Sequence, residues 1–72
     1  MKKDPRELFG QRLRKLRKAR GWSQEKLAFE CELDRSYIGG VEQGRRNISL
    51  LNICKIAKAL QKDPRELFEF NE

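Results

Sequence analysis

The side chains best suited to recognition chemistry are Arg35 and Ser36, which directly follow Asp34. Asp34 is a good helix N-cap, because its carboxylate can accept hydrogen bonds from the free backbone N–H groups of a first turn. The apolar spacing predicts a helix over about residues 35–43, with Gly44 ending it in the left-handed conformation. A short helix that begins with two donor side chains is suited to lying in a groove.

The outer face of this helix combines donors with little bulk. It carries Gly39, Gly40 and Gln43 as well as the two donors. Each glycine inside a helix costs about 1 kcal/mol relative to alanine. A surface helix with a solvated arginine is the alternative that this stretch alone leaves open.

The net charge of the 72 residues is +6, and it is concentrated at one end. Residues 1–20 hold nine Lys and Arg against two Asp and Glu, whereas residues 21–72 hold eight against nine. Such a balance indicates a nucleic acid or another anionic partner, although a solvated helix face has the same composition. The basic N-terminal stretch is expected to steer association rather than to make contacts.

Several functional classes are disfavoured by residues that are missing. The chain has no histidine, which is the usual general base and a common zinc ligand, and no Ser or Cys has an evident activating neighbour. We therefore predict no enzyme, no cofactor and no metal site, with Cys31 and Cys54 as buried, reduced thiols. No membrane-spanning run or signal-peptide pattern is present, so we expect a cytoplasmic protein without a membrane partner.

The remaining residues predict short helices that hold the first one in place. Helix starts are expected at Asp4, Ser23, Ser49 and Asp63, each a capping residue before an apolar period. The expected inward-facing residues are Phe9, Leu13, Leu16, Leu27, Ala28, Cys31, Leu50, Ile53, Ile56, Ala57 and Leu60. We predict one all-α domain over residues 1–72, with five helices and a helix-turn-helix formed by residues 23–31 and 35–43.

One seven-residue segment occurs twice: Lys3–Phe9 returns unchanged as Lys62–Phe68. Its Asp-Pro-Arg-Glu core supplies an N-cap, a proline at the first helical position and a glutamate three residues after the cap. Two copies do not make a repeat architecture. We interpret the segment as one helix-start solution used twice.

Five motifs in register make the chain resemble the Cro/C1-type (XRE-like) helix-turn-helix family, whose compact domain is lambda-repressor-like. They are Ser-Gln-Glu-Lys-Leu-Ala at 23–28, Leu-Asp-Arg-Ser-Tyr-Ile at 33–38, Glu-Gln-Gly at 42–44, Asn-Ile-Ser-Leu at 47–50 and Ile-Ala-Lys-Ala-Leu at 56–60. The match runs from about Phe9 to Phe68. Residues 33–38 with Arg-Arg-Asn-Ile-Ser at 45–49 are also similar to the small controller proteins of restriction–modification systems.

The resemblance implies a sequence-specific transcriptional regulator that binds a palindromic operator in double-stranded DNA as a homodimer. Arg35 and Ser36 match base-reading positions, and Arg17 with Glu42 matches a buried ion pair. The residues expected at the DNA backbone are Ser23, Gln24, Tyr37, Gln43, Arg45, Arg46 and Asn47, with one of the two loop arginines able to reach the minor groove. For Tyr37, packing in the core remains an equal alternative.

Two positions depart from the family pattern. Glu32 stands in the turn where glycine is usual, and a left-handed residue there carries strain of about 1 kcal/mol. Gly40 matches a position whose side chain often reads a base, and it has no side chain to do so. Specificity is therefore expected to depend mainly on Arg35.

The predicted dimer interface consists of Leu51, Phe68 and Phe70, the apolar residues that the core does not need. The alternative places Phe68 in the core and lets Phe70 fray. Glu25 is a candidate contact to RNA polymerase, although its place in a first helical turn explains it equally well.

Two other functions remain open at this point. One is a DNA-binding antitoxin. The other is a protein-interaction adaptor on the same fold, for which Phe29 and the C-terminal phenylalanines would form the partner surface. Arg35, Gln24 and the Arg45–Arg46 pair argue against an adaptor, which has no need of these donors together.

Overall fold

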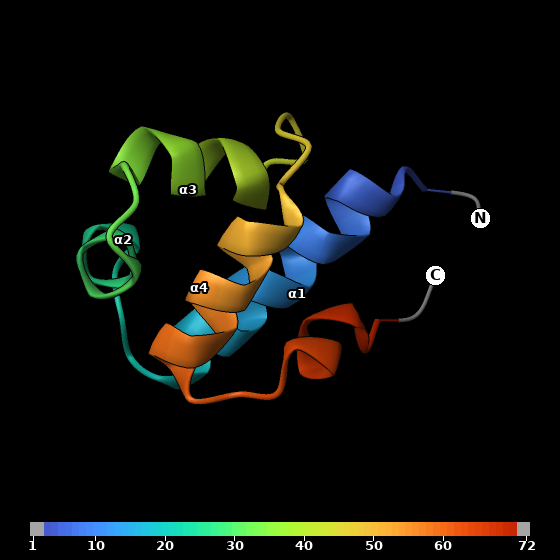
Figure 1. Cartoon of the computed structure of the whole chain (residues 1–72). Helices are drawn as coiled ribbons and strands as arrows, with labels where there is room; N and C mark the ends of the chain where they lie inside the picture. The colour runs from blue at the N-terminus through green and yellow to red at the C-terminus, as the bar shows by residue number, and fades with distance from the viewer. Residues whose placement is uncertain (1–2, 71–72) are drawn as a thin grey trace.

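The computed structural model describes residues 3–70, so the outermost residues of the predicted domain, 1–2 and 71–72, lie outside the described range. The elements are α1 Pro5–Ala19, α2 Gln24–Cys31, α3 Arg35–Glu42, α4 Leu50–Leu60 and the 3-10 helix η1 Pro64–Phe68 (Figure 1). The predicted all-α fold is confirmed, with the fifth helix formed as a short 3-10 helix. Residues 3–70 contain no strand.

Every helix begins at a predicted capping residue. The side chains of Asp4, Ser23, Asp34, Ser49 and Asp63 each accept a hydrogen bond from a backbone N–H in the first turn that follows. These N–H groups have no partner within the helix, so a cap that satisfies them fixes the starting point locally.

The turn between α2 and α3 contains a left-handed residue that is not glycine. Glu32 has φ 58° and ψ 42°, as expected from its position, and so carries strain of about 1 kcal/mol. Gln61 adopts the same conformation after α4, with φ 56°, which was not predicted. The helix-turn-helix is therefore closed by tertiary packing that overrides the local preference of Glu32.

The core lies where the four α-helices meet. Leu13, Leu27, Ile38 and Ile56 are completely buried, one from each α-helix. α1 packs against α3 and η1, whereas α2 packs against α3 and α4. Gly10 marks the closest approach of α1 to α3, because a Cβ atom there would lie 2.4 Å from the carbonyl oxygen of Val41.

Two core predictions on α4 are wrong. Leu50 is 75% exposed, although it shares a helix face with Ile53 and Ala57. It is the first residue of α4, and the helix has not yet reached the core at that turn. Cys54 is exposed because it follows Ile53 by one position, which turns it about 100° around the helix. Cys31 is buried as predicted, and this burial raises the pKa of its thiol.

Candidate nucleic-acid interface

The N-terminal end of α3 presents the two predicted base-reading residues to solvent. α3 and the loop after it lie along one edge of the molecule (Figure 1). Arg35 and Ser36 are exposed there. The Asp34 carboxylate accepts hydrogen bonds from the Ser36 backbone N–H at 3.0 Å and from the Ser36 hydroxyl at 2.9 Å. These bonds lower the pKa of Asp34 and leave the serine oxygen with lone pairs to accept a further hydrogen bond.

The predicted ion pair between Arg17 and Glu42 is present and buried. The guanidinium donates to both carboxylate oxygens, at 2.7 and 2.9 Å, and to the carbonyl oxygen of Trp22 at 2.7 Å. The exposed fractions of Arg17 and Glu42 are 6% and 8%, and the hydrogen bonds to Glu42 raise the arginine pKa. The pair ties α1 to the last residue of α3, so it fixes the helix that carries Arg35.

Gln24 extends this buried cluster. Its side-chain amide donates to the same Glu42 carboxylate at 3.0 Å. The amide has two N–H groups, so one remains for a phosphate. Ser23 is exposed at the N-cap of the same helix, where its hydroxyl oxygen accepts from the Lys26 backbone N–H at 3.0 Å. The two residues lie together at the start of α2, where the unpaired N–H groups of a helix favour an anion.

Tyr37 takes the packing role, which is one of the two roles that the sequence left open. Its ring is partly buried and packs against the core, while its hydroxyl oxygen accepts a hydrogen bond from the Asn52 side chain at 3.1 Å. The hydroxyl proton is still free to be donated. Asn52 was not singled out from the sequence, because no local signal links two residues that are 15 positions apart.

The loop after α3 holds the remaining predicted contacts. Arg45 donates to the side-chain oxygen of Gln43 at 2.8 Å, and both residues are exposed. The guanidinium carbon of Arg46 lies 5.4 Å from the centre of the Tyr37 ring, within the range of a cation–π contact. Asn47 is exposed beside it. This region therefore collects exposed cationic and amide groups next to α3.

Several arginines of the basic N-terminal stretch make contacts inside the protein instead of remaining free. Arg12 donates to the carbonyl oxygen of Glu66 at 2.8 Å, and Arg20 donates to the carbonyl oxygen of Leu60 at 2.8 Å. Arg20 also stacks over the Trp22 ring at 4.4 Å. Together with Arg17, these side chains connect α1 to α3, α4 and η1. The expectation that this stretch serves mainly to steer association is therefore incomplete.

The predicted dimer residues lie on two elements with different exposure. Leu51 is 66% exposed on α4, and Phe68 is 50% exposed on η1. The Phe68 ring lies 5.4 Å from the Phe9 ring and 6.5 Å from the Phe70 ring. Phe70 is partly buried against the core. The alternative from the sequence placed Phe68 in the core and left Phe70 frayed. In the structure Phe68 is half exposed, and Phe70 packs against the core.

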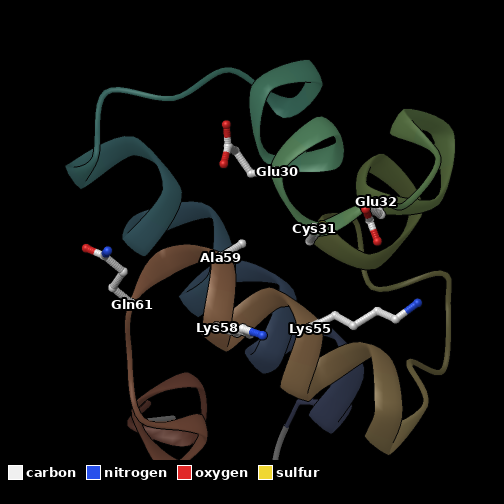
Figure 2. A pocket seen from close by; sticks show the side chains of 7 residues that line it. All are labelled: Glu30, Cys31, Glu32, Lys55, Lys58, Ala59 and Gln61. Carbon is white, nitrogen blue, oxygen red and sulfur yellow. The ribbon is translucent and has the colours of Figure 1, made fainter.

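An open groove of 560 Å³ lies between the C-terminal end of α2 and α4. Figure 2 shows Glu30 and Glu32 on one side of it and Lys55 and Lys58 on the other. No predicted DNA-contact residue lines this groove. Over residues 3–70, no three carboxylate or thiol groups gather as a metal ion would require, and no helix has the length and apolarity to cross a bilayer.

Comparison with known proteins gives consistent results. A family profile described as helix-turn-helix matches residues 13–67. The control protein C.BamHI of Bacillus amyloliquefaciens is 54% identical over 66 residues, which are 90% of this chain and 82% of that protein. The control protein C.MunI of a Mycoplasma species is 46% identical over 61 residues, covering 83% of this chain and 82% of the relative.

Solved structures extend the likeness to three dimensions. The restriction–modification controller protein C.AhdI from Aeromonas hydrophila superposes with a TM-score of 0.87 at 65% identity, over 88% of this chain and 96% of that one. The hypothetical transcription factor NHTF from Neisseria gives 0.88 at 43% identity, over 93% of this chain and 77% of that one. The chain therefore belongs to the helix-turn-helix family of DNA-binding transcriptional regulators, and it is similar to the control proteins of restriction–modification systems.

Proposed function

We propose that the chain regulates the genes of a restriction–modification system by binding a palindromic operator as a homodimer. α3 enters the major groove with its N-terminal end toward the base edges. Arg35 donates two hydrogen bonds to guanine O6 and N7, a contact worth about 1–3 kcal/mol of discrimination. Ser36 accepts a hydrogen bond from a base amino group, since its own proton is donated to Asp34.

The observation that carries this proposal is that an exposed Arg35 stands on a helix that is held in place at both ends. The Arg35 side chain is exposed, whereas α3 is held at its start by the Asp34 cap and at its last residue by the ion pair between Glu42 and Arg17. A base-reading side chain needs such a support, because a binding group must be held within about 0.5 Å of its productive geometry. Backbone contacts from Ser23, Gln24 and the loop then set the register on DNA.

A second copy doubles the few base contacts that one small domain can make. The half-exposed Phe68, the neighbouring Phe70 and the exposed Leu51 supply apolar surface for that copy. One protomer measures 32 × 22 × 22 Å along its principal axes, so two copies have the size to place their recognition helices about 34 Å apart, one turn of DNA. Leu51→Lys is expected to lower the apparent mass in sedimentation equilibrium toward that of the monomer. An unchanged apparent mass would show that Leu51 does not lie in the dimer interface.

A regulator of bacterial promoters acts in the cytoplasm and performs no catalytic reaction. RNA polymerase is included as a further partner, with the exposed Glu25 of α2 as the candidate contact. Glu25→Ala is expected to reduce activated transcription in vitro while operator affinity stays the same, and unchanged transcription would remove this contact.

The direct test is selection of bound duplexes from a random pool, followed by salt titration on the selected sequence. The expected result is a two-fold symmetric site with half-sites about one helical turn apart, and a steep fall of affinity with salt as counterions are released. Recovery of no common sequence, or binding that hardly depends on salt, would contradict the proposal and favour an adaptor role.

A further inference from the structure

Gly40 is buried in the middle of α3, at a position where glycine weakens a helix. A Cβ atom built there would lie 2.8 Å from Cγ of Arg46 and 3.7 Å from its Cδ. Cγ is close to the backbone, so relief of this contact requires the whole Arg46 side chain to move. The neighbouring Gly39 differs, because a Cβ there would meet only the side-chain oxygen of Gln24 at an ordinary 3.6 Å.

The backbone brings Arg46 back over the helix at this point. Gly44, with φ +75°, reverses the chain after α3, and the Arg45 N–H donates to the carbonyl oxygen of Gly40 at 2.9 Å. The Arg46 stem then lies on Gly40, and its guanidinium carbon reaches to 5.4 Å from the Tyr37 ring centre, one turn nearer the start of α3. The hydrogen bonds from Ser36 are the main cause of the lowered pKa of the Asp34 carboxyl at that helix start, and the charge of Arg46 adds a smaller contribution.

We propose that Gly40 is a positioning residue for DNA binding. Because Gly40 has no side chain, the aliphatic part of Arg46 can lie directly on α3 at this position. The Arg46 guanidinium is thereby held beside Tyr37 on the surface of α3. The inference rests on the proposed function for its consequence, which is a second cation near Arg35 on the surface that faces DNA. Gly40 reads no base itself. It determines where Arg46 can make its contact.

The test combines Gly40→Ala with Arg46→Ala, each alone and together. Gly40→Ala is expected to reduce affinity for the selected duplex about tenfold and to lower the salt slope by about one, as Arg46→Ala does. In the double variant the alanine at position 40 is expected to add nothing further, since the side chain that it displaces is already gone. Full wild-type affinity of Gly40→Ala, or additive losses in the double variant, would overturn the proposal.

A structural readout separates this inference from the proposed function. The Arg46 side-chain protons of the wild-type protein are expected to show ring-current shifts from Tyr37 in NMR spectra. These shifts are expected to be lost in Gly40→Ala and kept in the matched control Gly39→Ala, which adds the same methyl group one residue earlier. Unshifted Arg46 protons in the wild type would refute the proposed packing of Arg46 on Gly40. A wild-type protein that selects no duplex would refute the proposed function alone.

The same two substitutions, Gly40→Ala and Arg46→Ala, also show whether a loss of folding comes from the contact between these residues. If Gly40→Ala fails to fold because of the clash with Arg46, adding Arg46→Ala removes the clashing Cγ atom and is expected to restore cooperative unfolding in urea. Failure of the double variant to fold would show that Gly40 is needed for a reason other than Arg46, and would overturn the inference.

Discussion

Three arginines on α1 and its C-cap differ from Arg35 of α3 and Arg46 of the following loop in what they contact. Arg12, Arg17 and Arg20 each donate to a backbone carbonyl oxygen, and Arg17 donates to the buried Glu42 carboxylate as well. Arg35 is exposed at the start of α3, and Arg46 lies over Tyr37 with its guanidinium beside the helix. Residue type is therefore a poor guide to which cation meets DNA.

The difference follows from the surroundings of each guanidinium. An arginine with its donors committed to internal acceptors has few left for a phosphate or a base, whereas an exposed guanidinium keeps its planar set of donors. The most basic part of the sequence thus holds helices together through internal hydrogen bonds, in addition to its predicted role in attracting DNA. The nearly neutral remainder of the chain supplies the predicted contacts.

The largest expected effect is on the buried pair. Arg17→Ala leaves the Glu42 carboxylate uncompensated in the core and is expected to lower the free energy of unfolding by about 3–5 kcal/mol. Urea denaturation measures this change. The control, Arg17→Met with Glu42→Leu, removes both charges and is expected to recover most of the loss. If Arg17→Ala unfolds like the wild type, the comparison between internal and external arginines breaks down.

The next largest effect is expected on sequence-specific binding. Arg35→Ala is expected to lose about 1–3 kcal/mol of affinity for the selected operator and little for a scrambled duplex, because a base contact is lost while phosphate contacts remain. Fluorescence anisotropy with both duplexes measures the ratio, and an unchanged urea midpoint serves as control. Equal losses on both duplexes would show that Arg35 contacts the backbone and reads no base.

A smaller effect on stability is expected from Arg20. Removal of its side chain in Arg20→Ala takes away the donor to the Leu60 carbonyl oxygen and the stacking on Trp22, at a cost of about 1 kcal/mol. Operator affinity is expected to stay the same, which sharpens the distinction from Arg35. Trp22 fluorescence during urea unfolding provides the measurement. A clear loss of duplex affinity at unchanged stability would instead place Arg20 at the DNA.

The last expected effect concerns how binding depends on salt. Arg46→Ala is expected to weaken binding to all duplexes and to reduce the slope of log affinity against log salt by about one, because one phosphate contact is lost. Titrations between low and moderate salt give this slope. A slope equal to that of the wild-type protein would mean that Arg46 neutralises no phosphate.

The repeated segment shows how far sequence reasoning extends. Both copies start a helix at the predicted aspartate, and Asp4 and Asp63 each accept from the N–H two residues later. The first copy opens a 15-residue α-helix, whereas the second forms a five-residue 3-10 helix. The first phenylalanine, Phe9, is 4% exposed, and the second, Phe68, is 50% exposed. Identical sequence thus produces the same start and a different continuation.

The ion pairs of the two copies differ as well. Arg6 Nε donates to Asp4 Oδ1 at 3.1 Å, and hydrogen bonding to Arg6 lowers the pKa of that carboxyl to about 2, whereas the corresponding Nε and Oδ1 atoms of Arg65 and Asp63 are 3.9 Å apart. In the second copy the Glu66 carboxylate accepts a hydrogen bond from the Asp63 backbone N–H and completes a capping box. The same residues therefore support two different sets of hydrogen bonds around the capping aspartate.

Sequence alone determined the helix starts and most of the core, because caps and apolar periods act over four residues or fewer. The family followed from five motifs in register. The sequence also located the Arg17–Glu42 pair through the family resemblance. Tertiary structure decided what spacing cannot encode: the exposure of Leu50, the contact of Asn52 with Tyr37, and the space that Gly40 leaves for Arg46. Each of these depends on where a second element lies, and that position is set by the packing of the whole core.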